Sequence, residues 1–423
     1  MITGVRSPWA TEQFGLELQH LASATGDTVP DLVVPGLRRN PRRAHLLVST
    51  VLGKHIPTEP AAVIGAGDRL GDLVADLLGS AASDAVVLGF AETATGLGHC
   101  VASRLRARCY LHSTRRDVPG AGTFAGFEEG HSHATSHLLQ PTSPELFAND
   151  APLVLVDDEI STGATAVDAI RALHRHSPRA RYVVASLVDM RTAEHRRAVA
   201  EAAAGLGVRI DHVSLATGHT VLPGGLTERV GALPDPDLNP VAPERGTVDF
   251  VTLPWPATVP DGGRHGFLRT DTTAFDTAID RATDAVTTAL TPGRPVVVVG
   301  HEELMYLPLR IADALAGRGV ATRFQTTTRS PAYVRDVPGY PLRRGFTFTA
   351  PEPDDVPRYL YNARWPEGER AQLLLVLDDP ADTDRLRADG GLLDVLTAAG
   401  EDVVVAVVPA TDPAVLRADR EER

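Results

Sequence analysis

The sequence predicts an α/β protein with a parallel-sheet core, followed by a second α/β domain. Short apolar runs rich in valine and leucine recur along the chain, and such runs are typical of strands that are buried on both faces. Helical spacing of apolar residues follows several of these runs, which is the order of strand-helix-strand units around a parallel sheet. A length of 423 residues allows two or three domains.

Composition excludes several classes of protein. A formal net charge of −13 argues against general nucleic-acid binding, because contacts with a phosphate backbone require a basic surface. No apolar run approaches the roughly 20 residues that a membrane-spanning helix needs. The chain opens without a basic and apolar leader pattern, and two cysteines, Cys100 and Cys109, provide no disulfide framework. We therefore expect a cytoplasmic protein.

Two motifs precede the first predicted core strand. Residues 30–60 are locally basic and include Arg38-Arg39-Asn40-Pro41-Arg42-Arg43, which fits either a hood whose cations meet an anionic substrate or a solvated surface loop. The second motif is Gly65-Ala66-Gly67-Asp68-Arg69-Leu70-Gly71. Leu70 stands where a dinucleotide-binding fingerprint has its third glycine, so we interpret this motif as the start of a packed helix.

The first core strand is predicted at Val86–Phe90, and the loop 91–98 leads from it into a helix. Backbone N–H groups of such a loop could wrap a pyrophosphate. The next predicted strand, Cys109–His112, ends shortly before the adjacent cations Arg115 and Arg116. These two loops are therefore candidates for binding an anion.

Residues 117–140 are predicted to form a mobile lid, because the segment is long and rich in glycine. It carries three histidines and two adjacent acids: His131, His133, His137, Glu128 and Glu129. A closing flap is the first interpretation, in which His131 or His133 contacts a pyrophosphate or an acidic cosubstrate. A zinc site is an alternative, although the histidines lack a standard ligand spacing. A solvated loop remains open as well.

The most informative stretch begins with the apolar run Leu153–Val156, which is followed by Asp157, Asp158 and the turn Ser161-Thr162-Gly163-Ala164-Thr165. Helical spacing over residues 167–174 comes next. Hydroxyls, a glycine and a helix N-terminus together suit a phosphate, while the two acids can bind ribose hydroxyls or a hydrated Mg²⁺. An ordinary strand-turn-helix with a capping hydroxyl is the alternative. A Walker A loop is excluded, because the chain has no Gly-Lys-Ser/Thr sequence.

Another buried strand is predicted from Tyr182, and it ends at Asp189 and Arg191. Ligands of open α/β sheets bind beyond the carboxyl ends of strands. Asp189 and Arg191 are therefore candidates for contacts with a second substrate, and ordinary charge at a strand end is the alternative.

The second half of the chain repeats features of the first. Residues 217–263 are rich in proline and are predicted to be a linker or an extended arm between a domain at 1–216 and a domain at 264–423. Corresponding segments are Val86–Gly89 with Val297–Gly300, His112–Arg115 with Thr326–Arg329, and Leu153–Asp158 with Leu374–Asp379. Pro380-Ala381-Asp382 replaces the phosphate turn. We interpret the second domain as a degenerate repeat that binds rather than catalyses, with a chance likeness of two α/β units as the alternative.

The segment from Leu153 to Thr165 resembles the signature of the type I phosphoribosyltransferases, with Glu159 at a position where that family usually has an aliphatic residue. Thr328-Arg329-Ser330-Pro331 and the run from Gly300 to Tyr306 resemble the TRSP domain. That domain is found fused to the PRTase_2-like subtype, which is associated with tellurite-resistance and stress gene clusters. The two resemblances together cover most of the chain.

The resemblance implies a type I phosphoribosyltransferase core that uses Mg²⁺ and 5-phosphoribosyl 1-diphosphate (PRPP) and acts on a nucleobase-like acceptor in nucleotide metabolism. It implies catalytic roles for Asp157, Asp158, Arg115 and Arg116, with Asp157 and Asp158 holding Mg²⁺ through water. The substrate-binding residues that we expect are Thr93, Ala94, Thr95, Gly96, His131, His133, Glu159, Ser161, Thr162, Gly163, Ala164, Thr165 and Asp189. The resemblance also implies a homodimer. A regulatory protein that senses PRPP without converting it is the alternative function.

Overall fold

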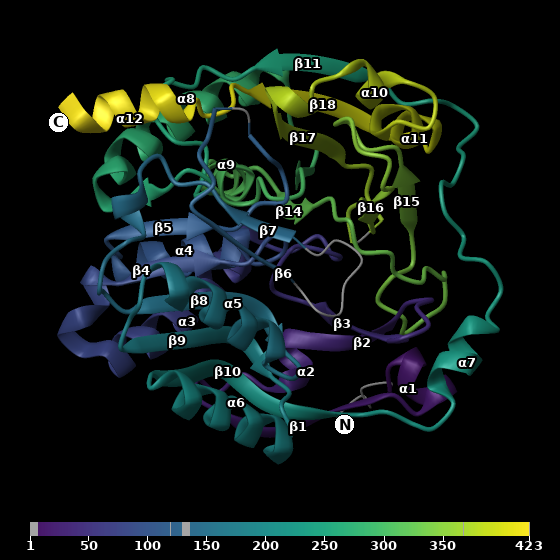
Figure 1. Ribbon diagram of the computed structural model, residues 1–423. Helices are drawn as coiled ribbons and strands as arrows, with labels where there is room; N and C mark the ends of the chain where they lie inside the picture. The colour runs from purple at the N-terminus through teal and green to yellow at the C-terminus, as the bar shows by residue number, and fades with distance from the viewer. Residues whose placement is uncertain (1–6, 119, 129–135, 367, 423) are drawn as a thin grey trace.

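The structure is a computed structural model that describes residues 7–118, 120–128, 136–366 and 368–422. A sheet of seven strands forms the centre of the N-terminal half, residues 7–221, and one of its edge strands, Phe267–Leu268, comes from the C-terminal half (Figure 1). Its strands, in order across the sheet, are β1 (Glu17–Ser23), β10 (Arg209–Val221), β9 (Arg181–Asp189), β8 (Leu153–Ile160), β4 (Val86–Gly89), β5 (Cys109–His112) and β12 (Phe267–Leu268). The inner strands are parallel, and β1 and β12 are antiparallel at the edges. The predicted parallel-sheet core is confirmed.

The C-terminal half, residues 222–422, is built on a separate sheet of five strands. In order across the sheet they are β11 (Val248–Thr252), β18 (Asp402–Val408), β17 (Gln372–Asp378), β13 (Val296–Gly300) and β14 (Thr322–Thr326). All of the neighbouring pairs are parallel. This confirms the prediction of a second α/β region.

Helices and hairpins surround the two sheets (Figure 1). The helices are α1 (Trp9–Phe14), α2 (Val29–Leu32), α3 (Pro60–Leu78), α4 (Thr95–Leu105), α5 (Ala164–His176), α6 (Ala193–Leu206), α7 (Leu226–Gly231), α8 (Thr272–Ala289), α9 (Tyr306–Gly317), α10 (Asp384–Arg387), α11 (Leu392–Ala398) and α12 (Pro413–Glu422). The hairpins are β2 (Val33–Leu37) with β3 (His45–Ser49), β6 (Ala125–Glu128) with β7 (Ser136–Leu139), and β15 (Gly345–Phe348) with β16 (Arg358–Tyr361). Within the described residues, no helix combines the length and the apolar character needed to cross a bilayer.

The strand order of the first sheet determines where a ligand would bind. β4 lies between β5 and β8, and the sheet then continues through β9 and β10. In open α/β sheets, ligands bind beyond the carboxyl ends of the strands at the point where the strand order reverses. That point lies between β4 and β8. The loops that follow these two strands therefore flank the expected site.

β8 is longer than the apolar run of the sequence indicates. It continues through the acids to Ile160 because β9 runs beside it, with Asp157 opposite Ser186 and Ile160 opposite Asp189. Side chains alternate along a strand, so Asp157 and Glu159 lie on one face and Asp158 on the other. The acids therefore belong to the sheet, and the turn begins only at Ser161.

Two glycines allow α3 and α4 to cross closely. A Cβ at Gly67 would lie 2.3 Å from Cys100 Cβ, and a Cβ at Gly71 would lie 2.8 Å from Arg104 Cβ. A side chain at either position would push the helices apart, since protein interiors are close-packed. The prediction that this glycine motif is helical is confirmed, but the helix begins earlier, at Pro60, where proline suits the first turn.

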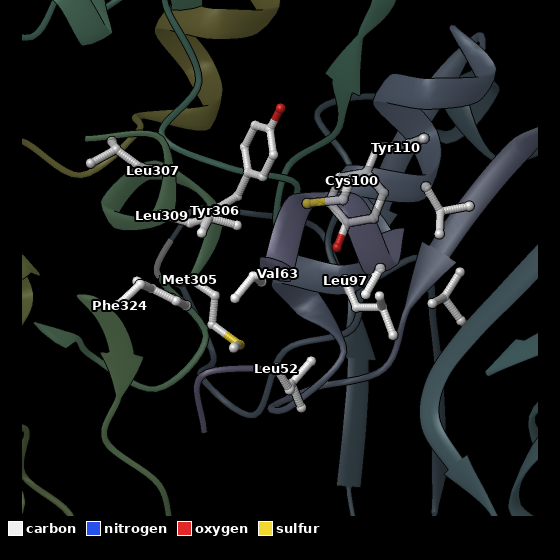
Figure 2. Close-up of a cluster of buried hydrophobic side chains, with 14 of the residues drawn as sticks. Leu52, Val63, Leu97, Cys100, Tyr110, Met305, Tyr306, Leu307, Leu309 and Phe324 are labelled. Carbon is white, nitrogen blue, oxygen red and sulfur yellow. The ribbon is translucent and has the colours of Figure 1, made fainter. Parts of the chain in front are cut away.

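An apolar core spans both halves (Figure 2). Leu97 and Cys100 of α4 are buried in the same cluster as Met305 and Tyr306 at the start of α9. The ring of His99 stacks on Tyr306, with 3.6 Å between centroids. Full burial of an apolar side chain contributes on the order of 1.5–3 kcal/mol, so this shared core holds the two halves against each other.

The proline-rich segment 217–263 contributes structural elements to both halves. It completes β10, forms α7 and contributes β11 to the second sheet. Figure 1 shows the chain passing along the outside of the molecule between α7 and β11. After β11, the short strand β12 returns to pair with β5 at the edge of the first sheet. The domain limits 1–216, 217–263 and 264–423 stay predictions.

Candidate active site at the switch point of the first sheet

The predicted phosphate turn joins β8 to α5. Gly163 has a φ of 84°, a left-handed conformation that favours glycine, and α5 begins at the next residue. A Cβ at Gly163 would lie 3.0 Å from Val199 and 3.3 Å from Arg191. Thr162 Oγ1 accepts a hydrogen bond from Ala164 N at 3.2 Å. The first N–H groups of α5 have no partner within the helix and its dipole favours anions, so this turn can bind a phosphate.

The side chains of the turn are accessible to a ligand. Ser161, Thr162, Ala164 and Thr165 are half-buried, whereas Gly163 is buried beneath them. The structure therefore brings the five predicted phosphate-binding residues together at one end of the first sheet. Two hydroxyls before the helix and one inside its first turn lie beside the N–H groups of the helix terminus.

Asp157 and Asp158 lie near the end of β8, separated from the turn by Glu159 and Ile160, and both are half-buried. Each carboxylate is oriented by the following peptide group. Asp158 N donates to Asp157 Oδ1 at 2.9 Å, and Glu159 N donates to Asp158 Oδ1 at 3.1 Å. Carboxylate oxygens are the ligands that Mg²⁺ prefers, commonly with several waters retained. The chemistry of each carboxylate therefore fits a hydrated Mg²⁺, which would be held through its waters because the two side chains lie on opposite faces of β8.

The predicted hood corresponds to the hairpin β2–β3, and an ion pair joins it to β8. Arg43 Nη2 lies 2.6 Å from Glu159 Oε1. Arg43 Nε also donates to His45 Nε2 at 3.1 Å, and Arg38 Nε donates to Arg43 O at 3.0 Å. Burial and the charges of Arg43 and Arg38 lower the pKa of His45 to about 3, so its ring is neutral and can accept this bond. Arg43 of the basic segment thus forms an ion pair with Glu159 of the same chain.

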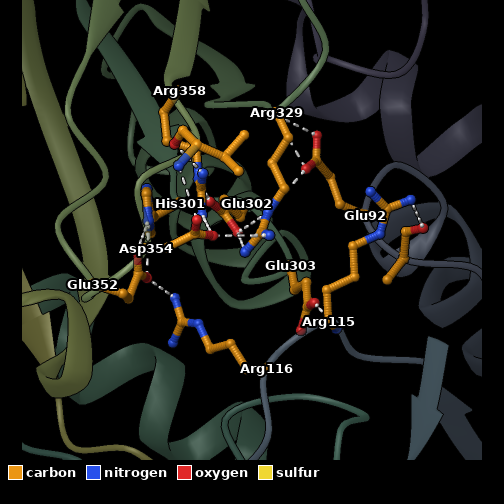
Figure 3. A network of polar contacts seen from close by, with 12 residues as sticks. Glu92, Arg115, Arg116, His301, Glu302, Glu303, Arg329, Glu352, Asp354 and Arg358 are labelled. Carbon is orange, nitrogen blue, oxygen red and sulfur yellow. Dashed lines mark hydrogen bonds and ion pairs between the residues drawn. The ribbon is translucent and has the colours of Figure 1, made fainter. Parts of the chain in front are cut away.

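The loop after β4 is anchored to the C-terminal half. Glu92 is 6% exposed, and the peptide bond before it is cis. Its carboxylate accepts hydrogen bonds from the hydroxyl of Thr328 and from Arg329 N, the latter at 3.1 Å (Figure 3). Two of the four residues of the TRSP motif therefore contact the loop that is predicted to bind pyrophosphate.

The four predicted pyrophosphate ligands of this loop differ in exposure. Thr93 is half-buried, while Ala94, Thr95 and Gly96 are buried. Thr95 and Gly96 already belong to α4, so their N–H groups lie in its first turn. A Cβ at Gly96 would lie 3.0 Å from Met305 Cβ, which shows how closely the C-terminal half approaches. Thr93 is the most accessible of the four.

The structure separates the guanidinium groups of the two adjacent arginines. Arg116 Nη1 lies 2.7 Å from Asp378 Oδ2, and Arg116 also pairs with Glu352, so its side chain enters the C-terminal half (Figure 3). Arg115 instead remains near the loop after β4, where its Nη2 donates to Ala91 O at 3.5 Å. Arg115 is therefore the cation that lies beside the predicted pyrophosphate loop.

The described part of the predicted lid is the hairpin β6–β7. His137 is fully buried, with Nδ1 2.8 Å from Ser113 Oγ and its ring stacked on Phe127 at 4.6 Å between centroids. The hairpin is thus joined to the segment that follows β5. The predicted ligands His131 and His133 lie outside the described residues.

Asp189 is buried in an ion pair beneath the phosphate turn. Arg191 binds both of its carboxylate oxygens, each at 2.9 Å, and the side chain of Arg191 also lies next to Gly163. Burial by itself would raise the pKa of Asp189, but the hydrogen bonds and charge of Arg191 lower it. A ligand would therefore meet a neutralised pair at this strand end.

A second group of polar residues lies in the C-terminal half. His301, Glu302 and Glu352 offer ligand atoms within 4.8 Å of one another, a spacing that could hold a metal ion. Glu302, however, pairs with the fully buried Arg358, and Glu352 pairs with Arg116. Because arginines already neutralise these carboxylates, the residues fit an ion-pair network better than a cation site (Figure 3).

Two acids that join the halves, Glu92 and Glu303, were not among the residues predicted from the sequence. Glu303 accepts hydrogen bonds from residues of the loop after β5. A signal was available in the repeat, because Glu92 follows Gly89 at the same spacing as Glu303 follows Gly300. The two glycines lie in segments that the sequence already shows to correspond.

Comparisons with known families agree with this arrangement. Residues 32–219 match a family model described as phosphoribosyl transferase (PRTase_2). Residues 261–396 match the TRSP domain that is C-terminal to this transferase. No curated protein matches the chain.

Solved structures of adenine phosphoribosyltransferases are similar to part of the chain. The enzyme of Trypanosoma brucei is 14% identical, with 48% of this chain and 86% of that chain covered and a TM-score of 0.35. The enzyme of Giardia lamblia is 16% identical, with 45% and 96% covered and a TM-score of 0.33. The enzyme of Leishmania tarentolae is 12% identical, with 51% and 98% covered and a TM-score of 0.32.

The sheet order, the phosphate turn and the family match together define the N-terminal half as a phosphoribosyltransferase, an enzyme of the glycosyltransferase class. The chain belongs to the family in which this transferase is followed by a TRSP domain.

Proposed function

We propose that the N-terminal half transfers the phosphoribosyl group of PRPP to a nitrogen of a nucleobase-like acceptor. The observation that carries this proposal is the position of Asp157 and Asp158 among the last residues of β8, shortly before the phosphate turn and at the switch point of the sheet. In this assignment the turn binds the 5-phosphate and the two acids bind the ribose hydroxyls. The same acids would hold a hydrated Mg²⁺, which neutralises negative charge on the pyrophosphate when it is bound.

The transfer depends on the positioning of the two substrates more than on covalent catalysis by the protein. The lone pair of the acceptor nitrogen forms a bond to C1 of the ribose, and the bond between C1 and the pyrophosphate oxygen breaks with its electron pair leaving on that oxygen. The proton of the acceptor nitrogen passes to solvent. Positive charge that develops on the sugar is favoured by Asp157 and Asp158, and negative charge on the leaving group by Arg115 and the first N–H groups of α4.

The acceptor would lie between the hood and the end of β8. The ion pair of Arg43 with Glu159 bounds this side and presents polar atoms. A nucleobase-like molecule, which carries both donors and acceptors, matches such a lining. Because the 5-phosphate stays on the ribose, the product would be a nucleoside-like metabolite in its 5-phosphorylated form, and the resemblance to the stress-linked subtype implies a role for it in stress.

Pyrophosphate release tests the proposal. The purified full chain is incubated with PRPP, Mg²⁺ and each of a panel of purine and pyrimidine bases. We expect release with at least one base, and loss of release in the double variant Asp157→Asn, Asp158→Asn while the melting temperature is unchanged. Release by the double variant at the rate of the natural protein would contradict the roles assigned to both acids.

A second function, sensing of PRPP without turnover, is favoured by one observation. Glu92 and Arg116, at the two predicted pyrophosphate loops, are both held by side chains of the C-terminal half. A site anchored in this way could hold PRPP and report its presence. Binding of PRPP without release for any base would favour this function, and absence of PRPP binding would contradict both.

A further inference from the structure

The two sheets repeat both the strand order and the register. The order β5-β4-β8-β9 of the first sheet recurs as β14-β13-β17-β18 in the second, and all of these pairs are parallel. Gly89 lies opposite His112, and Gly300 lies opposite Thr326. Helices α4 and α9 begin at the same interval after the two glycines. These pairings define equivalent positions in the two halves.

Hydrogen bonds of the equivalent loops repeat as well. Ser113 Oγ accepts from Ala91 N at 2.9 Å in the N-terminal half. Its equivalent, Thr327 Oγ1, accepts from Glu302 N at 3.0 Å in the C-terminal half. Each hydroxyl thus ties the loop after the first core strand to the loop after the second. An arrangement of this detail is not required by strand order alone, so it supports a repeat.

The hairpins beside the two sheets are attached in the same way. The backbone of Thr114 exchanges two hydrogen bonds with Leu138 of β7, at 2.9 and 2.8 Å. The backbone of Thr328, the equivalent threonine, exchanges two with Tyr359 of β16, also at 2.9 and 2.8 Å. The hairpin β15–β16 therefore takes the place in the C-terminal half that β6–β7 has in the N-terminal half.

A first clasp joins the halves at Glu303. This side chain is 4% exposed and belongs to the loop after β13 of the C-terminal half. Its carboxylate accepts hydrogen bonds from Thr114 Oγ1 and from Arg115 N, both at 2.7 Å. The acid of the C-terminal half thus fixes the loop after β5 that carries the candidate pyrophosphate cation.

A second clasp runs in the opposite direction. Glu92, which is equivalent to Glu303, accepts hydrogen bonds from the hydroxyl of Thr328 and from Arg329 N. Thr328 and Arg329 are equivalent to the threonine and arginine of the first clasp. The same three positions of each half therefore contact those of the other, and such reciprocity is the mark of an isologous, two-fold interface.

We propose that the TRSP half is a built-in second subunit of the transferase, related to the catalytic half by an approximate two-fold axis. In this pairing Glu303 is a positioning residue that holds Arg115 and its loop against the site where pyrophosphate leaves. This inference rests on the proposed function for the identity of the ligand. The clasp itself rests on the contacts of Glu303 and Glu92 alone.

Besides the missing phosphate turn, one asymmetric position after the clasp distinguishes the two halves. Arg116 has Ser330 as its equivalent. The guanidinium of Arg116 reaches Asp378 at the carboxyl end of β17, together with Glu352, and so fills the switch point of the second sheet. Ser330 has only a short neutral side chain, so the C-terminal half has no equivalent cation at this position. In the C-terminal half, Arg116 therefore occupies the place where a ligand would bind at the switch point, while the clasp is retained.

The test compares Glu303→Ala and Glu303→Gln with a matched control, Glu401→Ala. Glu401 is 12% exposed and lies 2.6 Å from Arg344, but it precedes β18 at the opposite end of the second sheet. Amide hydrogen exchange of the segment 113–118 measures whether the loop is held, and pyrophosphate release measures kcat and KM for PRPP. Melting temperatures check that each variant is folded.

We expect Glu303→Ala to raise the exchange rate of this segment about tenfold or more and to lower kcat/KM for PRPP by about tenfold to a hundredfold, because two donors at the loop lose their acceptor. Glu303→Gln retains one acceptor oxygen and should lie between. Glu401→Ala should change neither readout.

Unchanged exchange in Glu303→Ala, or faster exchange with unchanged PRPP kinetics, would overturn the inference. Absence of turnover in the natural protein would instead contradict the proposed function. The exchange data would then still decide the clasp, since an equal effect of Glu303→Ala and Glu401→Ala on the segment would overturn it.

Discussion

In the N-terminal half, β8 leads into a turn of two hydroxyls and a glycine before α5, whereas β17 of the C-terminal half leads into a 3₁₀ helix at Asp379–Ala381. Both strands occupy the third place of the same strand order. The sheet is therefore common to both halves, but only one retains N–H groups and hydroxyls that suit a phosphate. We therefore assign the proposed function to the turn and not to the fold that carries it.

The acids of the two halves differ in the same sense. Asp157 and Asp158 are half-buried at the end of β8. Asp378 at the end of β17 is 1% exposed and paired with Arg116. Accessible carboxylates can bind a cation or a sugar, whereas a buried and neutralised carboxylate contributes to the interface between the halves. The site at the end of β8 is thus open, whereas the equivalent place at the end of β17 is occupied by Arg116.

The largest effect is expected from removal of the acids in one half. The double variant Asp157→Asn, Asp158→Asn should lower kcat at least about a thousandfold, because charge on the developing sugar cation is no longer stabilised. The matched change Asp379→Asn, at the exposed acid that follows β17, should leave kcat unchanged. Pyrophosphate release measures both. Equal losses in the two variants would contradict the division of roles.

The next effect is a dependence of stability on acid pH at the clasp. Burial raises the pKa of Glu303, but Arg264, His112 and Arg115 N lower it, to about 2. Its contribution is complete above its ordinary pKa and is lost as pH falls through the lowered value, which amounts to on the order of 3 kcal/mol. The unfolding free energies of the natural protein and Glu303→Gln should therefore converge between pH 5 and pH 2. A constant difference over that range would contradict the pairing.

The sequence predicted the parts of the fold that depend on local pattern. The run Leu153–Val156 marks a buried strand, and the turn Ser161–Thr165 marks the start of a helix. It did not predict that β8 continues to Ile160, because that length is determined by pairing with β9. Nor did it predict the clasps, since hydrogen bonds between residues as distant as Thr114 and Glu303 leave no local pattern.

The predicted repeat needed one correction from the sheet register. The correspondences of Gly89 with Gly300 and of His112 with Thr326 agree with the ladders. In the third strand, however, Val156 and Val376 lie opposite these glycines, so Asp158 and not Asp157 is equivalent to Asp378. The sequence comparison had matched the adjacent acids Asp157-Asp158 with Asp378-Asp379. That match displaces the third strand by one residue from the register of the sheets.

A smaller effect is expected from backbone strain at the phosphate turn, where Gly163→Ala can be compared with Gly293→Ala. Gly163→Ala and Gly293→Ala both place a side chain at a left-handed residue, and each should cost about 1–2 kcal/mol of stability. Only Gly163 is crowded, with Val199 at 3.0 Å, whereas a Cβ at Gly293 meets nothing within 4 Å. We expect about tenfold weaker PRPP binding in Gly163→Ala alone, measured by calorimetry. Equal affinities would contradict the placement of phosphate at this turn.

The smallest effect concerns the hood. Arg43→Met removes the partner of Glu159 and should raise KM for the acceptor by roughly threefold to tenfold while the Kd for PRPP is unchanged. Arg39→Met, in the same hairpin, removes a surface pair with Asp235 and serves as the control. Steady-state kinetics with saturating PRPP measure the first quantity. A loss of PRPP affinity in Arg43→Met would place the pair on the donor side of the site.

The most direct test of one open site in a duplicated scaffold is the stoichiometry of PRPP binding. Calorimetric titration of the full chain with PRPP and Mg²⁺ should give one site per chain, and that site should disappear in the double variant Asp157→Asn, Asp158→Asn. Two sites per chain, or binding that survives in the double variant, would contradict the account.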